Sequence, residues 1–209
     1  WKAPAGVALN SDFTVKVRLQ DGVWHTLSSY LIKVDEVRDT RHYVENASMA
    51  IFDFTGKVEV AVTYNLGEVQ TAKVRPLSYD IPFQIDGNTV TFTLEHPRNL
   101  SVEVNGDIFH NLHLFTGSPE RTIPDKDNPE VIYFGPGIHT VKNGELRVPS
   151  GKTVYLAGGA VLMGRVLIEN VHDVKLLGRG IIDYSIKGGI RIANSRDVYV
   201  EGIVATQCA

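Results

Sequence analysis

The C-terminal part of the chain repeats a short pattern of strand, polar turn and strand. Segment 148–154 (VPSGKTV) is followed after 20 residues by segment 168–174 (IENVHDV), and after 24 more by segment 192–198 (IANSRDV). Repeats of about 20 to 50 residues are typical of solenoids and arrays, because a single unit cannot bury its apolar face alone. A unit this short, built of strands and turns, predicts one coil of a parallel β-helix.

The alignment of the three copies extends beyond these segments. Valines and glycines keep the same spacing, namely Val154, Val174 and Val198, and Gly158, Gly178 and Gly202. Asn170 and Asn194 share one turn position. A leucine-rich repeat is the alternative, but it requires leucine at fixed positions and a helical or 3₁₀ return. The sequence has Val, Ile and Gly there and offers no helical stretch, which favours the β-helix.

Residues 12–116 show a different pattern, in which apolar and polar residues alternate. Segments 58–64 (VEVAVTY) and 89–94 (TVTFTL) are examples. A period of two with one polar face indicates antiparallel strands that pack on one side. Several such strands, separated by Asp-Gly and Asn-Gly turn signals, predict a β-sandwich. The segment 34–50 is less regular, and we predict a long loop or a short helical turn there.

The two patterns divide the all-β chain into three parts. Residues 1–116 form the predicted antiparallel β-sandwich, and residues 144–209 form the start of the β-helix. Residues 117–143 are predicted to be a linker and joining strands, because the stretch 117–130 is rich in Pro and Asp and has no period.

The composition excludes several classes of function. With a formal net charge of -3 and no basic stripe, the chain lacks the charge pattern of a nucleic-acid-binding protein. No apolar run approaches the roughly 20 residues of a membrane span. The single cysteine, Cys208, excludes an intramolecular disulfide and a Cys-x-x-Cys motif. Neither nucleic acid nor a membrane is therefore expected as a partner.

Three motifs in the repeat region resemble known enzymes. Residues 131–139 (VIYFGPGIH), 148–161 (VPSGKTVYLAGGAV) and 177–183 (LGRGIID) resemble polysaccharide-cleaving β-helix enzymes, namely glycoside hydrolase family 49 (dextranase and isopullulanase type) and the polygalacturonase-like family 28. The resemblance implies a β-sandwich followed by a right-handed parallel β-helix. It also implies hydrolysis of O-glycosidic bonds, with inversion and a pair of carboxyl groups, in an α-glucan or pectin-type polysaccharide. A secreted or periplasmic location and no cofactor are further expectations.

The resemblance assigns no catalytic residue to this chain. In those families the catalytic aspartates lie on later coils, in an Asn-Thr-Asp segment and an Asp-Asp pair, and the sequence contains neither motif. The chain alone is therefore expected to be inactive. Its last residues, 202–209, form an apolar strand within the third coil, whereas a solenoid needs a polar cap. We expect the front of a longer protein, or self-association through an uncapped helix end that contains Cys208.

Two residues of the last motif are candidate substrate-binding residues. Asp183 could face a groove, and its counterpart one coil later is expected to be Gln207, so no carboxylate pair forms there. Arg179 could pair with an acidic sugar or lie between coils. Asp173 and Asp197 are equivalent and about 4.8 Å apart if the coils stack. Glycosidases need carboxyl groups about 5–5.5 Å apart for retention or 6.5–9.5 Å for inversion, but we favour solvated turn residues.

The sandwich offers a few further candidates. His110 and His113 are expected on opposite faces of a strand, with no acidic or Cys cluster beside them, so no metal site is predicted. Four aromatic residues could form the core or a sugar-stacking platform, and the core is favoured: they are Trp24, Phe52, Phe54 and Tyr64.

Two other functions stay open at this point. A platform on the sandwich would suit a non-catalytic carbohydrate-binding or adhesion module. A pectate-lyase-like eliminase would need a calcium-binding Asp cluster, and the sequence shows none.

Overall fold

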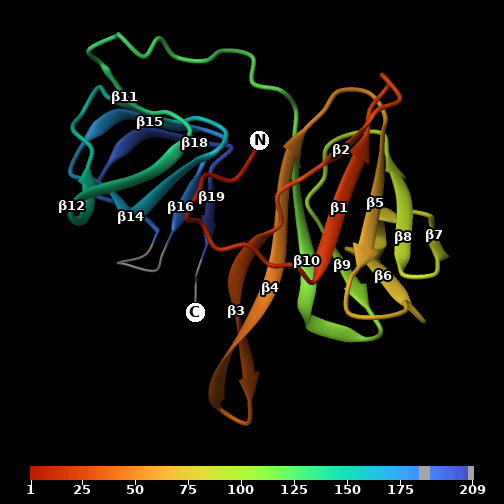
Figure 1. Cartoon of the computed structure of the whole chain (residues 1–209). Coiled ribbons are helices and arrows are strands. Elements are labelled where there is room, and N and C mark those ends of the chain that lie inside the picture. The colour runs from red at the N-terminus through yellow and green to blue at the C-terminus, as the bar shows by residue number, and fades with distance from the viewer. Residues whose placement is uncertain (184–188, 207–209) are drawn as a thin grey trace. The chain divides into compact units, whose positions relative to one another are not determined.

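The computed structural model describes residues 1–183 and 189–206. Its regular structure is almost entirely β, and the described residues include one short 3₁₀ helix, η1 (Leu77–Tyr79) (Figure 1). The chain forms two compact units, one of Trp1–Lys2 and Ala8–Pro119 and one of Ala3–Val7 and Glu120–Ala209. The predicted all-β fold class is confirmed. Within the described ranges, no helix is long and apolar enough to cross a membrane.

The first unit contains two five-stranded sheets. The first sheet is antiparallel throughout, in the order β2 (Trp24–Thr26), β1 (Phe13–Arg18), β5 (Val58–Tyr64), β8 (Thr89–Leu94) and β7 (Phe83–Asp86). The second has the order β3 (Tyr30–Arg38), β4 (Arg41–Asp53), β10 (Asp107–Gly117), β9 (Leu100–Val104) and β6 (Ala72–Arg75). It is antiparallel except for β4 and β10, which pair in parallel.

The core of this unit follows the predicted alternation. Val60 lies opposite Phe92 in the first sheet, and both are buried. Val102 and Leu112 lie opposite each other in the second sheet and belong to the same apolar cluster. One buried face per strand explains why apolar and polar residues alternate along β5 and β8.

A long hairpin occupies the segment for which a loop or helical turn was predicted. β3 and β4 pair from Tyr30 with Met49 to Arg38 with Arg41, and the turn between them is Asp39–Thr40. The prediction is therefore wrong for segment 34–50. Most side chains in the outer half of the hairpin are exposed, so backbone pairing defines these strands and no alternation of burial marks them.

The second unit is a parallel β-helix of about three turns (Figure 1). One sheet stacks β11 (Val131–Phe134), β13 (Thr153–Leu156), β15 (His172–Gly178) and β18 (Arg196–Glu201). The other stacks β12 (Gly137–Arg147), β14 (Ala160–Glu169), β16 (Ile181–Asp183) and β19 (Val204–Thr206), and β17 (Ile190–Ala193) also pairs with β14. Every pair is parallel.

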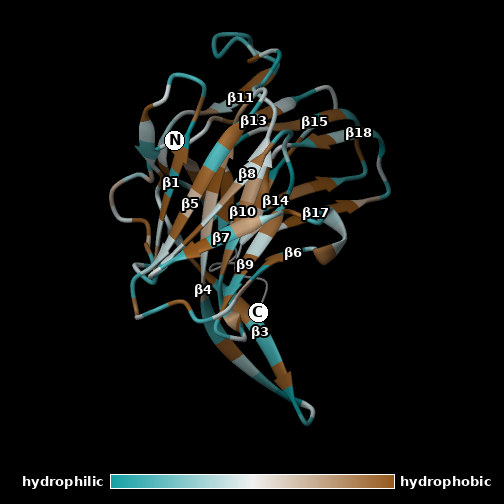
Figure 2. Cartoon of the chain, turned by 90° about the vertical axis from the view of Figure 1, so that its right-hand side faces the viewer, coloured by the Kyte–Doolittle hydropathy of each residue, from teal (hydrophilic) through white to brown (hydrophobic). Residues whose placement is uncertain are grey.

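Apolar side chains from successive coils form the core of the β-helix. Val154, Leu156, Leu162, Ile168 and Leu176 are all fully buried in one cluster. Figure 2 shows apolar residues in brown along the strands of both units. Each unit therefore has its own hydrophobic core.

The register between the first two copies of the repeat differs from the prediction. Val154 lies opposite Leu176, and Leu156 lies opposite Gly178, which is a spacing of 22 residues and not 20. A spacing of 20 holds in the other sheet, where Arg147 lies opposite Leu167 and Val161 lies opposite Ile181. The stretch from Leu167 to Lys175 is two residues longer than the stretch from Arg147 to Thr153, which accounts for the difference. The predicted spacing of 24 is confirmed for the next coil, where Val174 lies opposite Val198.

Gly178 and Gly202 mark places where successive coils approach closely. A Cβ on Gly178 would lie 1.9 Å from the carbonyl oxygen of Leu156, and one on Gly202 would lie 2.1 Å from the carbonyl oxygen of Gly178. Both glycines also have positive φ, at 126° and 76°. Only glycine fits at these two positions.

Candidate functional site

Asp183 is the last residue of β16 and is half-buried. Its neighbours in the sheet are Met163 on β14 and Thr206 on β19. The prediction that Gln207 is the counterpart of Asp183 is therefore wrong by one residue. The spacing between paired residues of β16 and β19 is 23 residues and not 24. This row of the described sheet holds a single carboxylate, so it provides no acid and base pair for glycoside hydrolysis.

Arg179 lies between successive coils. Its backbone N–H donates to the carbonyl oxygen of Leu156 at 2.8 Å, and its Nη1 donates to the carbonyl oxygen of Gly178 at 2.9 Å. The same Nη1 lies 2.0 Å from the place where Gly202 would carry a Cβ. The guanidinium therefore packs over the backbone of the following coil.

A pair of stacked tyrosines lies close to Arg179. Tyr133 and Tyr155 are opposite each other in β11 and β13, with ring centroids 5.2 Å apart. The Tyr155 hydroxyl donates to Oε2 of Glu120 at 2.9 Å, and only 1% of this tyrosine is exposed. Burial raises the pKa of Tyr155, the hydrogen bond to Glu120 raises it further, and the charge of Arg179 opposes both. No sequence motif predicted this cluster, although the two tyrosines recur at the 22-residue coil spacing.

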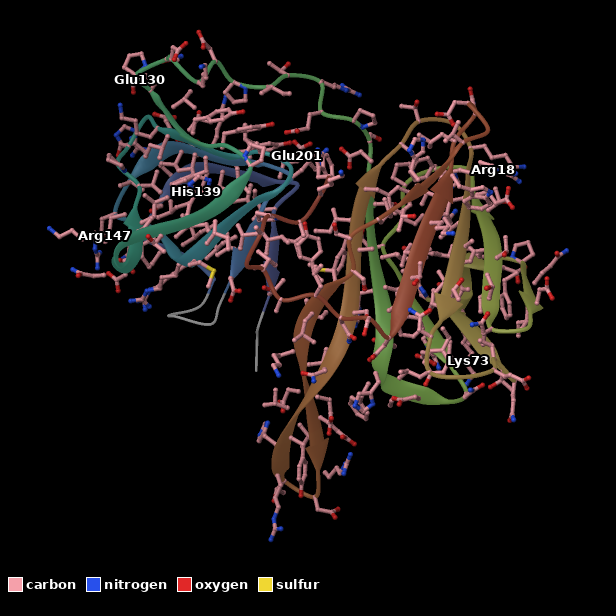
Figure 3. All side chains as sticks on the ribbon, in the orientation of Figure 1. Arg18, Lys73, Glu130, His139, Arg147 and Glu201 are labelled. Carbon is pink, nitrogen blue, oxygen red and sulfur yellow. The ribbon has the colours of Figure 1, made fainter. Side chains whose placement is uncertain are left out.

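Charged side chains form a ladder on the outside of β12, β14 and β17. Arg147, near the end of β12 in Figure 3, contacts Glu145 at 3.1 Å and Glu169 at 3.3 Å. Arg165 contacts Glu145 at 2.5 Å, and Arg191 contacts Glu169 at 2.8 Å. The ion pairs join side chains of β12, β14 and β17, so the ladder ties neighbouring coils together.

Asp173 and Asp197 are equivalent, as predicted, but they are the second residues of β15 and β18 and not turn residues. They precede Val174 and Val198, which lie opposite each other, and both have φ near 55°. Their side chains are 66% and 65% exposed. Asp173 contacts the ring of His172 at 2.8 Å. The favoured interpretation of solvated aspartates is confirmed.

The two histidines of β10 have separate environments. His110 contacts Asp107 at 2.9 Å and Glu45 at 3.1 Å, so the expectation that no acidic residues accompany it is wrong. The hydrogen bond that the His110 ring donates to Asp107 is the main cause of a raised pKa for His110, and Glu45 adds to it. His113 is stacked with Phe115, and burial lowers its pKa. No group of three potential metal ligands occurs among the described residues.

The four aromatic residues of the sandwich do not form one platform. Phe52 and Phe54 are buried in the core, and Tyr64 packs against it. The favoured core interpretation is confirmed for these three. Trp24 is exposed on β2, where the Arg18 guanidinium lies 4.8 Å from its ring centroid.

Comparison with known proteins supports the fold. No family model matches the chain, and no curated protein matches it. Among solved structures, Dex49A from Penicillium minioluteum, a family 49 dextranase, is similar with a TM-score of 0.66 and 16% sequence identity. The match covers 88% of this chain and 48% of Dex49A, so the chain spans about half the length of that protein. The fold is therefore that of the polysaccharide-cleaving β-helix enzymes which the sequence resembles.

Proposed function

We propose that this chain, which shares its fold with about half of Dex49A, is the N-terminal portion of a polysaccharide-degrading glycoside hydrolase. The observation that carries the proposal is the structural match over 88% of the chain. The proposed reaction is hydrolysis of O-glycosidic bonds in an α-glucan or pectin-type polysaccharide. Because a polysaccharide is too large to enter a cell intact, we further propose that the protein is secreted or periplasmic.

The proposed chemistry uses two carboxyl groups and inverts the anomeric centre. One carboxylic acid protonates the leaving oxygen, and a carboxylate activates a water molecule on the opposite face of the sugar, across a gap of about 6.5–9.5 Å. In the described part of this chain, the row of Asp183 contains a single carboxylate, and Glu145 and Glu169 are both paired with arginines. We propose that coils outside this chain supply the acid and the base.

The described residues have a supporting part in this proposal. Stacked coils hold side chains at equivalent positions about 4.8 Å apart along the helix, so the coils of this chain give later coils a rigid support. That support is stabilised by the ion-pair ladder and by the buried cluster of Val154, Leu156 and Leu176.

The test compares this chain with the longest reading frame that contains it. Both are incubated with dextran, pullulan and polygalacturonate while reducing ends are measured, and proton NMR follows the anomer first released. We expect no hydrolysis by the 209-residue chain and inverting hydrolysis by the longer protein. Robust hydrolysis by the short chain would show that the catalytic groups lie within it. A longer protein that binds a polysaccharide without cleaving it would support the alternative, a carbohydrate-binding module.

A further inference from the structure

The β-sandwich unit carries a groove of about 640 Å³, which we call the sandwich groove. It is lined by Lys57 and Glu59 of the β5 side, by segment 79–84 before and within β7, and by segment 91–96 and Arg98 of the β8 side. Small-molecule sites typically have volumes of about 300–1,000 Å³ and combine apolar surface with a few polar groups. No sequence motif predicted this groove.

Two exposed aromatic side chains line the sandwich groove. Tyr79 belongs to η1, in which no residue is buried, and it is 39% exposed. The Arg98 guanidinium lies 4.4 Å from its ring centroid, which holds the ring in place. Phe83 is also exposed, on the edge strand β7, but it lies opposite the buried Phe92 and so belongs to the core-facing side of the sheet. The face of an aromatic ring carries partial negative charge, so it attracts the polarised C–H face of a sugar ring.

Polar side chains line the same groove in cross-strand pairs. Gln84 lies opposite Thr91, and Glu59 lies opposite Thr93. Because Thr91 and Thr93 are two residues apart, all four side chains belong to one face of the sheet. Together they provide amide, hydroxyl and carboxylate groups that can donate to and accept from sugar hydroxyls.

The charges that line the groove favour a neutral ligand. Its cations are Lys57 and Arg98, and its carboxylates are Glu59, Asp80 and Glu95. Glu59 is paired with Arg18 from outside the lining, and the Lys57 ammonium lies 3.9 Å from a carboxylate oxygen of Glu95. The charges therefore balance, and the lining offers no surplus of cations to the carboxylates of a polyuronate.

We propose that the sandwich groove binds a neutral polysaccharide. The choice of a polysaccharide, among ligands rich in hydroxyl groups, rests on the proposed function. The site itself rests on the exposed Tyr79 and on the paired polar side chains. Its role is to hold substrate on the protein without cleaving it.

The test measures binding by the 209-residue chain in affinity gel electrophoresis with dextran, pullulan or polygalacturonate in the gel. The main variant is Tyr79→Ala. The matched control is Tyr43→Ala on the β3–β4 hairpin, because Tyr43 is 38% exposed and has the Arg38 guanidinium 4.9 Å from its ring. Gln84→Ala is a second groove variant, and circular dichroism establishes that each variant is folded.

We expect dextran or pullulan to retard the wild type and Tyr43→Ala equally, and Tyr79→Ala to bind about tenfold more weakly, as befits the loss of one aromatic contact. Gln84→Ala is expected to weaken binding in the same gel. Polygalacturonate is expected to retard neither the wild type nor any of the three variants. Three results would overturn the proposal: no retardation by either neutral glucan, equal losses in Tyr79→Ala and Tyr43→Ala, or equal retardation by polygalacturonate. Because no step here requires hydrolysis, failure of the groove is distinguishable from failure of the proposed enzyme.

Discussion

The hydroxyl group of Tyr155 donates a 2.9 Å hydrogen bond to Glu120, which lies 35 residues earlier in the chain. Tyr155 belongs to β13 in the second coil, whereas Glu120 lies in the Pro- and Asp-rich stretch that follows β10. The bond therefore ties an irregular segment to a regular coil. Because Tyr155 is almost fully buried, its hydroxyl has little access to water as an alternative partner.

Removal of this hydroxyl should destabilise the protein. We expect Tyr155→Phe to lower the free energy of unfolding by about 1.5–3 kcal/mol, the usual range for a hydrogen bond to a charged group. Urea titration followed by circular dichroism measures the change. The control is Tyr199→Phe, which removes an exposed hydrogen bond to Glu201 and should cost less than about 0.5 kcal/mol. Equal losses in the two variants would contradict the assigned role of burial.

The raised pKa of Tyr155 has a consequence for stability at high pH. A group whose pKa is higher in the folded state contributes stability that is complete below its unfolded value, about 10 for tyrosine, and is lost as the pH rises through the folded value. We therefore expect the wild type to lose stability above pH 10 more steeply than Tyr155→Phe. Unfolding midpoints measured between pH 8 and 11 test this. Parallel curves for the two proteins would count against it.

His110 should make stability depend on pH in a lower range. Its pKa is raised by Asp107 and then by Glu45, so its contribution is complete below about pH 6.5 and lost as the pH rises through the folded value. We expect His110→Gln to be less stable than the wild type at pH 5.5 and nearly equal at pH 8.5. Since the side chain is 46% exposed, the difference should be about 0.5 kcal/mol or less. NMR titration of the His110 ring provides the direct measurement, and a midpoint at or below 6.5 would refute the prediction.

Gly178 should tolerate no side chain. Gly178→Ala would place a Cβ 1.9 Å from the carbonyl oxygen of Leu156, so the coils would have to separate. We expect a loss of about 3 kcal/mol or more, or failure to fold. Gly151→Ala is the control, because Gly151 also has a positive φ, of 78°, but has no atom within 4 Å of the added Cβ. It should cost only about 1–2 kcal/mol; similar thermal melting points for the two variants would rule out a close approach of the coils.

The register of 22 residues can be tested by crosslinking. In a Cys208→Ser background, cysteines at positions 153 and 175 are expected to form a disulfide under mild oxidation, because Thr153 and Lys175 lie opposite each other. Cysteines at positions 153 and 173 correspond to a register of 20, and their separation would exceed the roughly 7 Å limit for a disulfide. Mass spectrometry of the digested protein distinguishes the two. Preferential crosslinking of position 153 to position 173 would contradict the register of 22 and support the register of 20 expected from the repeat.

The β3–β4 hairpin and the sandwich groove show where prediction from sequence failed. In β5, Val58, Val60 and Val62 face a core, so apolar and polar residues alternate in the sequence. The outer half of β3–β4 has no such core, and its pairing leaves no periodic signal. Likewise, Phe52 and Tyr79 are both aromatic, but one is in the core and the other is exposed beside a groove. Composition alone does not separate these environments.

The sequence by itself determined the fold class and the two-part organisation, because the period of apolar residues reports which side chains are buried. It also placed Asp173 and Asp197 at equivalent exposed positions. Only the tertiary structure decided that Val154 lies opposite Leu176 and that Glu120 reaches Tyr155. The physical reason is that side chains in a strand alternate with a period of two. A shift of register by two residues buries the same face, so the length of the turns, and not the pattern of the strands, selects the partner.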